Sequence, residues 1–163
     1  MNYIHKQLVE IGYKWCLKKC GFAFKELTTI NDSGEIPDVI GFNSEGTFLL
    51  EAKISRGDFF SDKKKPFRIH SYQGMGDWRF YICPKGMIEV EELPPLWGLI
   101  EVDSNNKTRV VKNPFGKGNI YSRWNKVEKN ERSEKQLLYS ALRRIHLRGL
   151  MDVIYESQII EVI

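Results

Sequence analysis

The hydrophobic and polar positions of the first twenty residues follow the period of a helix. Ile4, Leu8, Ile11 and Trp15 recur at steps of three or four residues, which places them on one face. The pattern predicts an amphipathic helix over residues 3–20, with one apolar side directed towards the rest of the domain.

Six later segments have the short, apolar character of β-strands, and each is bounded by turn-forming residues. The stretch 43–46, Asn-Ser-Glu-Gly, separates two of them and is typical of a hairpin turn. The strand that follows this turn is apolar until its charged end, as expected for a buried central strand. The predicted strands are 22–27, 36–42, 47–53, 78–83, 96–102 and 108–112.

Two further helices are expected. Ser55 can cap a helix over residues 56–65, which stops near Pro66 because proline disfavours helix at the residue before it. Residues 133–136, Ser-Glu-Lys-Gln, match a capping box and predict a last helix that ends near Gly149. The segment 113–126 is expected to be a basic loop, and 151–163 fits either helix or strand.

This order of elements predicts an α/β fold, with a central mixed sheet of about five strands flanked by helices. The chain has 163 residues, which suits a single domain over residues 1–163 with one hydrophobic core. No apolar run approaches the length needed to cross a bilayer, and the first residues lack the features of a signal peptide. A cytoplasmic location without membrane contact is therefore expected.

The three cysteines agree with that location. Cys16, Cys20 and Cys83 include no CxxC pair, and an odd number of cysteines argues against a disulfide framework. Small buried apolar side chains are the favoured interpretation for all three.

Asp38, Glu51 and Lys53 are the candidate catalytic residues. Asp38 lies on one strand of the predicted hairpin, while Glu51 and Lys53 end the other. Alternate residues of a strand face the same way, so Glu51 and Lys53 share a face. Burial of these charges at the end of an apolar strand is costly unless they pair or bind an ion. That cost favours a functional site over a surface ion pair.

Two carboxylates on neighbouring strands suit Mg²⁺ or Mn²⁺, which prefer oxygen ligands. Asp38, Glu51 and the backbone carbonyl of Ala52 are the expected ligands. Glu10 on the first helix is a further candidate ligand. Glu35 is expected on the opposite strand face unless the backbone bends at Pro37, and a surface carboxylate remains the favoured interpretation for both Glu10 and Glu35.

Basic residues gather beside this site. The chain has 25 basic and 21 acidic residues, a net charge of only +4, but the window 51–68 holds six basic residues against three acidic ones. A local positive field attracts phosphates. The candidate nucleic-acid contacts are Arg56, Lys63, Lys64 and Arg68. A second basic and aromatic group, Lys117, Arg123, Trp124 and Lys126, fits either a single-strand-binding surface or an ordinary loop.

The pattern Pro37-Asp38 followed by Glu51-Ala52-Lys53 resembles the PD-(D/E)xK nuclease superfamily. Residues 51–64, EAKISRGDFFSDKK, are similar to the MmcB-like branch, small bacterial proteins linked to DNA repair with uncharacterised relatives in phages and mobile elements. The resemblance covers roughly residues 35–102. It implies a restriction-endonuclease-like core, metal binding by Asp38 and Glu51, and a catalytic role for Lys53.

The sequence therefore predicts a Mg²⁺- or Mn²⁺-dependent nuclease that hydrolyses phosphodiester bonds in DNA. The alternative is a catalytically inactive module of the same fold that binds nucleic acid or a protein partner, since a fold does not guarantee activity. A homodimer is compatible with either function.

Overall fold

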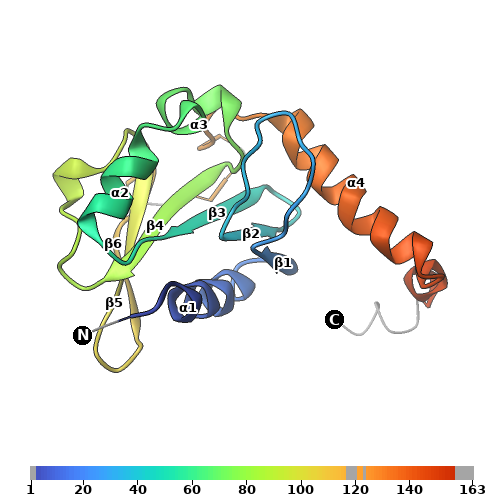
Figure 1. Cartoon of the computed structure of the whole chain (residues 1–163), viewed down its shortest axis with the longest axis horizontal. Coiled ribbons are helices and arrows are strands. Elements are labelled where there is room, and N and C mark those ends of the chain that lie inside the picture. Colours follow the sequence, from blue (N-terminus) through green and yellow to red (C-terminus); the bar gives the residue numbers. More distant parts are fainter. Residues whose placement is uncertain (1–2, 117–120, 123, 157–163) are drawn as a thin grey trace.

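The computed structural model describes residues 3–116, 121–122 and 124–156. They form one mixed sheet of six strands with helices on its faces (Figure 1). The α/β class is confirmed, while the expected five strands are corrected to six. In chain order, the strands are β1 (Phe22–Lys25), β2 (Val39–Phe42), β3 (Thr47–Ala52), β4 (Trp78–Pro84), β5 (Trp97–Val102) and β6 (Thr108–Lys112).

The strands lie in the sheet in their chain order, from β1 to β6. β1, β2 and β3 form an antiparallel meander, and the turn after β2 occupies the predicted hairpin position. β3, β4 and β5 are parallel, and β6 returns antiparallel to β5. β3 and β4 therefore lie in the centre of the sheet, and every residue of β3 is buried, as its apolar sequence predicts.

Helix α1 (His5–Leu17) covers one face of the sheet and confirms the first predicted helix. Its buried side chains include Leu8, Val9 and Trp15, which pack in one core cluster with Leu50 and Phe80. The Trp15 and Phe80 rings meet edge to face, with 5.1 Å between their centroids. Of the predicted stripe, Leu8 and Trp15 are buried and Ile11 is half-buried, whereas Ile4 precedes the helix and is 64% exposed.

Helices α2 (Arg56–Lys63) and α3 (Pro66–Ile69) lie over the opposite face. Short 3-10 turns follow at η1 (Ser71–Gln73) and η2 (Val90–Glu92). Ser55 caps α2 by accepting a hydrogen bond from the Asp58 amide, as expected. A second core cluster between these helices and the sheet contains Leu49, Phe59 and Tyr81.

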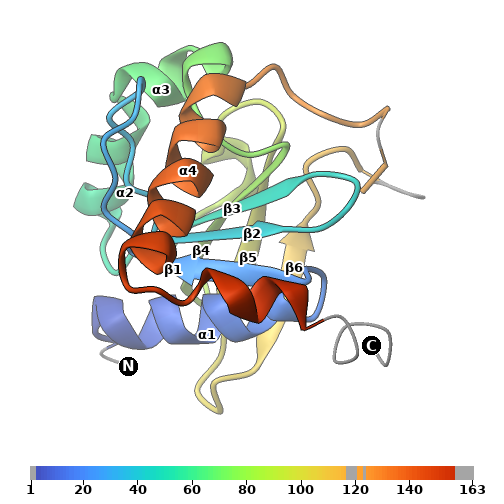
Figure 2. The same cartoon turned by 90° about the vertical axis from the view of Figure 1, so that its right-hand side faces the viewer.

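The last long helix, α4 (Glu131–Leu147), starts two residues before the predicted capping box. Asn130 is its cap and accepts a hydrogen bond from the Ser133 amide. Ser133 instead accepts a hydrogen bond from the Ser33 amide, which ties α4 to the loop before β2 (Figure 2). Of the apolar residues of α4, only Leu137 is fully buried. The 3-10 turn η3 (Met151–Tyr155) follows.

Close packing behind β2 depends on Gly41. A Cβ atom at this position would lie 2.3 Å from Cys16 Sγ and 2.9 Å from Cys20 Sγ. The two thiols are themselves 3.7 Å apart. All three cysteines are unbridged, as the sequence predicts.

Within the described residues, no helix is long and apolar enough to cross a membrane. Lys117 and Arg123 of the second basic group lie outside the described residues, as does the segment 157–163. Of that group, Trp124 is exposed and Lys126 is half-buried.

Candidate functional site

Asp38 and Glu51 approach the same end of the sheet. The β2–β3 ladder pairs Val39 with Leu50, so one further step along both chains places Asp38 opposite Glu51. Asp38 Oδ2 accepts a hydrogen bond of 2.8 Å from the Ala52 amide. Because the N–H and C=O of one strand residue point to the same side, the Ala52 carbonyl is directed towards Asp38 as well.

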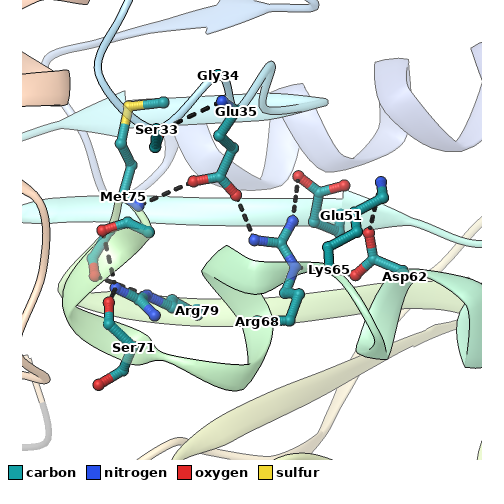
Figure 3. Close-up of polar contacts among 12 residues, drawn as sticks. Ser33, Gly34, Glu35, Glu51, Asp62, Lys65, Arg68, Ser71, Met75 and Arg79 are labelled. Atoms are coloured by element: carbon teal, nitrogen blue, oxygen red, sulfur yellow. Dashed lines mark hydrogen bonds and ion pairs between the residues drawn. The ribbon is translucent and has the colours of Figure 1, made fainter.

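Glu51 is buried and forms an ion pair with Arg68 of α3. Its Oε1 lies 2.9 Å from Arg68 Nη2. The same guanidinium pairs with Glu35 through Nη1 and with Asp62 through Nε. Figure 3 shows Arg68 between these carboxylates, with the side chains of Arg68, Glu35 and Asp62 each about 1% exposed. One cation thus holds together acids from three separate segments.

Lys53 reaches the same buried network from the end of β3. Its Nζ lies 3.4 Å from Asp62 Oδ1 and 3.9 Å from both Glu51 Oε2 and Asp58 Oδ1. The Lys53 side chain is only 6% exposed. The predicted proximity of Glu51 and Lys53 is therefore present, and Asp62 fixes the ammonium group beside them.

The network drives the pKa values of two of its buried acids, Glu51 and Asp62, in opposite directions. Burial raises the pKa of Glu51 well above 4.5, and the charges of Asp38 and Asp62 add to this rise, outweighing Arg68. For Asp62, burial also opposes ionisation, but Arg68, Lys53 and the Tyr81 hydroxyl hold its pKa below the ordinary value. Glu51 is thus the carboxylate whose ionisation most needs a further cation.

A second group of ligand atoms lies on the other side of Asp38. His5 Nε2 is 3.3 Å from Asp38 Oδ2, and His5 Nδ1 is 3.5 Å from Glu26 Oε1. Within the described residues, His5, Glu26 and Asp38 form a group whose ligand atoms all lie within 4.8 Å of one another. An imidazole with two carboxylates suits transition metals such as Mn²⁺ better than Mg²⁺.

The favoured interpretation as a surface carboxylate is wrong for Glu35 and agrees with the structure for Glu10, while Arg68 lies in surroundings that the sequence does not predict. Glu35 is buried rather than exposed, because residues 35–38 precede β2 and strand alternation does not apply to them. Arg68 is buried among carboxylates, so it is not positioned to contact a nucleic-acid phosphate. Glu10 is a partly exposed carboxylate paired with Lys25, as its favoured interpretation expects, and His5 supplies the contact from α1 to Asp38.

The other predicted phosphate contacts differ in their surroundings. Arg56 binds both Glu92 oxygens and the Met87 carbonyl. Lys63 donates a hydrogen bond of 2.6 Å to the Glu92 carbonyl. Lys64 is exposed and remains a candidate phosphate contact. Phosphate binding by Arg56 or Lys63 would therefore compete with existing contacts.

The side chains that surround Asp38 fit a divalent cation, and Glu51 lies nearby on β3. Glu51 Oε1 makes no hydrogen bond in the described part of the chain, although it is buried and faces Arg68. Buried polar atoms are normally hydrogen-bonded or bound to an ion. His5, Glu26 and Asp38 are the groups whose ligand atoms lie close enough together to hold one cation, whereas Glu51 is not part of that group and faces Arg68 and Lys53.

Comparison with protein-family models and with curated proteins finds no match. Among solved structures, the chain is similar to a protein of unknown function from Silicibacter pomeroyi. The two share 22% sequence identity, with a TM-score of 0.55 over 91% of this chain and 94% of the other. This similarity defines the chain as an α/β protein with that overall fold, and it carries no information on activity.

Proposed function

We propose that this protein is a metal-dependent nuclease that hydrolyses phosphodiester bonds in DNA. The observation that carries the proposal is the gathering of Asp38, Glu51 and Lys53 at one end of β3. Burial of such charges costs stability even when they are paired, and clusters of this kind occur often at functional sites.

The order of elements supports the same function. One helix precedes a meander of three antiparallel strands, and α2 then leads to a parallel strand, β4. A helix, a strand hairpin bearing the acids and lysine, a helix and another strand are the elements that the resemblance to PD-(D/E)xK nucleases implies. A restriction-endonuclease-like core of the MmcB-like type is therefore part of the proposal.

Asp38 would hold the cation, with Glu51 and the Ala52 carbonyl as the ligands expected from the sequence and with His5 and Glu26 as the ligand atoms grouped on the other side of Asp38. When bound, Mg²⁺ or Mn²⁺ would polarise a phosphate oxygen and lower the pKa of a coordinated water. Lys53 is a fixed positive charge that would offset the negative charge developing on the phosphate. Asp62, 3.4 Å from Lys53 Nζ, keeps that charge in place.

Cleavage assays test the proposal directly. Supercoiled plasmid, linear duplex and single-stranded DNA are incubated with Mg²⁺, Mn²⁺ or EDTA. Wild type should cut only with metal, and Asp38→Asn should lower the rate roughly 100-fold, equivalent to about 2.7 kcal/mol of transition-state stabilisation. Glu131→Gln, an exposed carboxylate on α4, is the matched control and should cut normally. Cleavage by Asp38→Asn at the wild-type rate would refute the proposal.

A second candidate function is a nuclease-fold module that binds nucleic acid or a protein without catalysis. The position of Arg68 favours it, because the guanidinium already supplies positive charge to Glu51. This function predicts salt-sensitive DNA binding that persists in EDTA and survives Asp38→Asn, with no cleavage of any substrate. If the protein neither cleaves nor binds DNA, binding of a protein partner is the remaining form of this second function.

A further inference from the structure

A cleft of about 320 Å³ lies between α3, the segment before β5 and residues 126–128. Pro94, Pro95 and Leu96 form an apolar wall, and Lys126 and Val127 lie on another side. Arg79 is among the buried residues that line it. Its volume falls at the lower end of the range for pockets that hold small ligands.

Arg79 is a buried cation held by backbone carbonyls. It is 1% exposed. Its Nε donates to the Gly76 carbonyl at 2.9 Å, and its Nη2 donates to the carbonyls of Ser71, Gly74 and Glu128 at 2.8, 3.1 and 3.3 Å. Figure 3 shows the guanidinium beside Ser71. No carboxylate of the described residues forms an ion pair with it.

The neighbouring Arg68 provides the contrast. Arg68 forms ion pairs with three carboxylates, whereas the hydrogen bonds of Arg79 described above all go to backbone carbonyls. Fully buried charges in proteins are normally paired. Burial lowers the pKa of Arg79 to about 10, so the group is still charged at neutral pH. Glu35, Glu134 and Asp77 act on this charge only from beyond ion-pair distance, so no carboxylate of the described residues contacts it.

Arg79 also retains hydrogen-bonding capacity. A guanidinium has five N–H donors, and within the described residues the two on Nη1 make no hydrogen bond. Lys126 donates to the Glu45 carbonyl, which leaves further donors of its ammonium group for a ligand. A phosphate is the anion that such a pair of cations binds best, since guanidinium donors match its oxygens.

We propose that this cleft binds a phosphate-bearing ligand of nucleotide size, either a free mononucleotide or a phosphorylated nucleotide at the end of a nucleic-acid strand. Arg79 Nη1 and Lys126 contact the phosphate, while Pro94, Pro95 and Leu96 cover the sugar or base. Ligand binding in this cleft requires neither a metal nor catalysis at the site around Glu51. The proposal is therefore independent of whether the protein is a nuclease.

Glu128 gives the site an internal control. It lines the cleft and is exposed, and its negative charge opposes an anionic ligand. Glu128→Gln should therefore strengthen phosphate binding, whereas Lys126→Gln should weaken it. Each of these substitutions removes one charge from the same side of the cleft. Opposite effects of the two on phosphate binding cannot arise from a general loss of stability.

Calorimetric titrations in EDTA test the proposal, with dAMP, deoxyadenosine and inorganic phosphate as probes. We expect dAMP to bind at least roughly tenfold more tightly than either deoxyadenosine or inorganic phosphate. Lys126→Gln should weaken dAMP binding roughly tenfold, and Glu128→Gln should strengthen it about threefold. Lys135→Gln, an exposed lysine on α4, is the control and should bind dAMP as wild type does.

Oligonucleotides with and without a 5′-phosphate distinguish the two sources of the ligand. Tighter binding of the phosphorylated strand than of dAMP assigns the cleft to strand ends, and the reverse order assigns it to free nucleotides. The proposal is overturned if no probe binds at millimolar concentration, if dAMP and deoxyadenosine bind equally, or if the Lys126 and Glu128 variants leave dAMP affinity unchanged. Equal binding of inorganic phosphate and dAMP would overturn the role of the apolar wall.

Discussion

Replacement of Arg68 by methionine is the sharpest perturbation of the buried network. The side chain is 1% exposed and forms ion pairs with Glu35, Glu51 and Asp62. Methionine keeps the apolar stem while removing the charge. Three buried carboxylates would then lack their shared cation, with only the lysines at the edge of the network left to offset them.

Removal of one partner from a buried ion pair costs about 3–5 kcal/mol. The penalty of Arg68→Met should reach this range at pH 7.5, which is a large part of a total stability of about 5–15 kcal/mol. The acids limit the loss by taking up protons, since their pKa values rise once the cation is gone. The folded variant then binds more protons than its unfolded chain, so its stability falls as the pH rises above about 4.5.

Urea denaturation followed by circular dichroism at pH 4.5, 6.0 and 7.5 measures this effect. The loss relative to wild type should shrink to about 2 kcal/mol at pH 4.5, the size of an ordinary packing change. Arg132→Met, whose side chain is 75% exposed, is the control and should stay within about 0.5 kcal/mol of wild type. Wild-type stability of Arg68→Met at pH 7.5, or an equal loss at all three pH values, would refute the reasoning.

Three further predictions concern other parts of the structure. Glu51→Gln should be more stable than wild type at pH 8, because burial raises the pKa of Glu51 and makes its ionisation unfavourable. In the same denaturation series, this gain in stability should vanish below pH 4.5. A gain in stability that does not depend on pH would contradict the prediction. Gly41→Ala should lower stability by about 1–3 kcal/mol, because its Cβ would meet Cys16 Sγ at 2.3 Å. Thermal denaturation should show partial recovery in Gly41→Ala/Cys16→Ala, and simple additivity would argue against this clash. His5→Ala should weaken Mn²⁺ binding roughly tenfold in an electron paramagnetic resonance titration with little effect on Mg²⁺, whereas equal effects on both metals would remove His5 from the ligand set.

The parts of the fold that the sequence predicts best are those with strong local patterns. The hairpin turn at residues 43–46 fixes the register of β2 and β3, and strand alternation then places Glu51 and Lys53 together. The position of Asp38 opposite Glu51 follows from the same register. These three residues could therefore be brought to one region of the sheet by reasoning from the sequence alone.

The rest of the site depends on contacts that local patterns do not encode. Strand alternation placed Glu35 on the wrong side because β2 begins only at Val39. Arg68 lies in a basic window, which predicts a surface position, but α3 turns it towards Asp62 and towards Glu35 and Glu51, which are distant in sequence. His5 had no signal beyond its residue type, and only the packing of α1 brings it within 3.3 Å of Asp38.

Comparison of two lysine variants tests the central claim most directly. Lys53 and Lys129 each pair with two or more acids. The partners of Lys129 are Asp77, directly before β4, and Glu134 in the first turn of α4, away from the proposed chemistry. The measurement is the rate of Mn²⁺-dependent DNA cleavage by folded Lys53→Met and Lys129→Met. The nuclease proposal predicts a loss of roughly 100-fold or more for Lys53→Met and nearly wild-type cleavage for Lys129→Met. Equal rates for the two variants, or no cleavage by wild type on any DNA substrate, would contradict it.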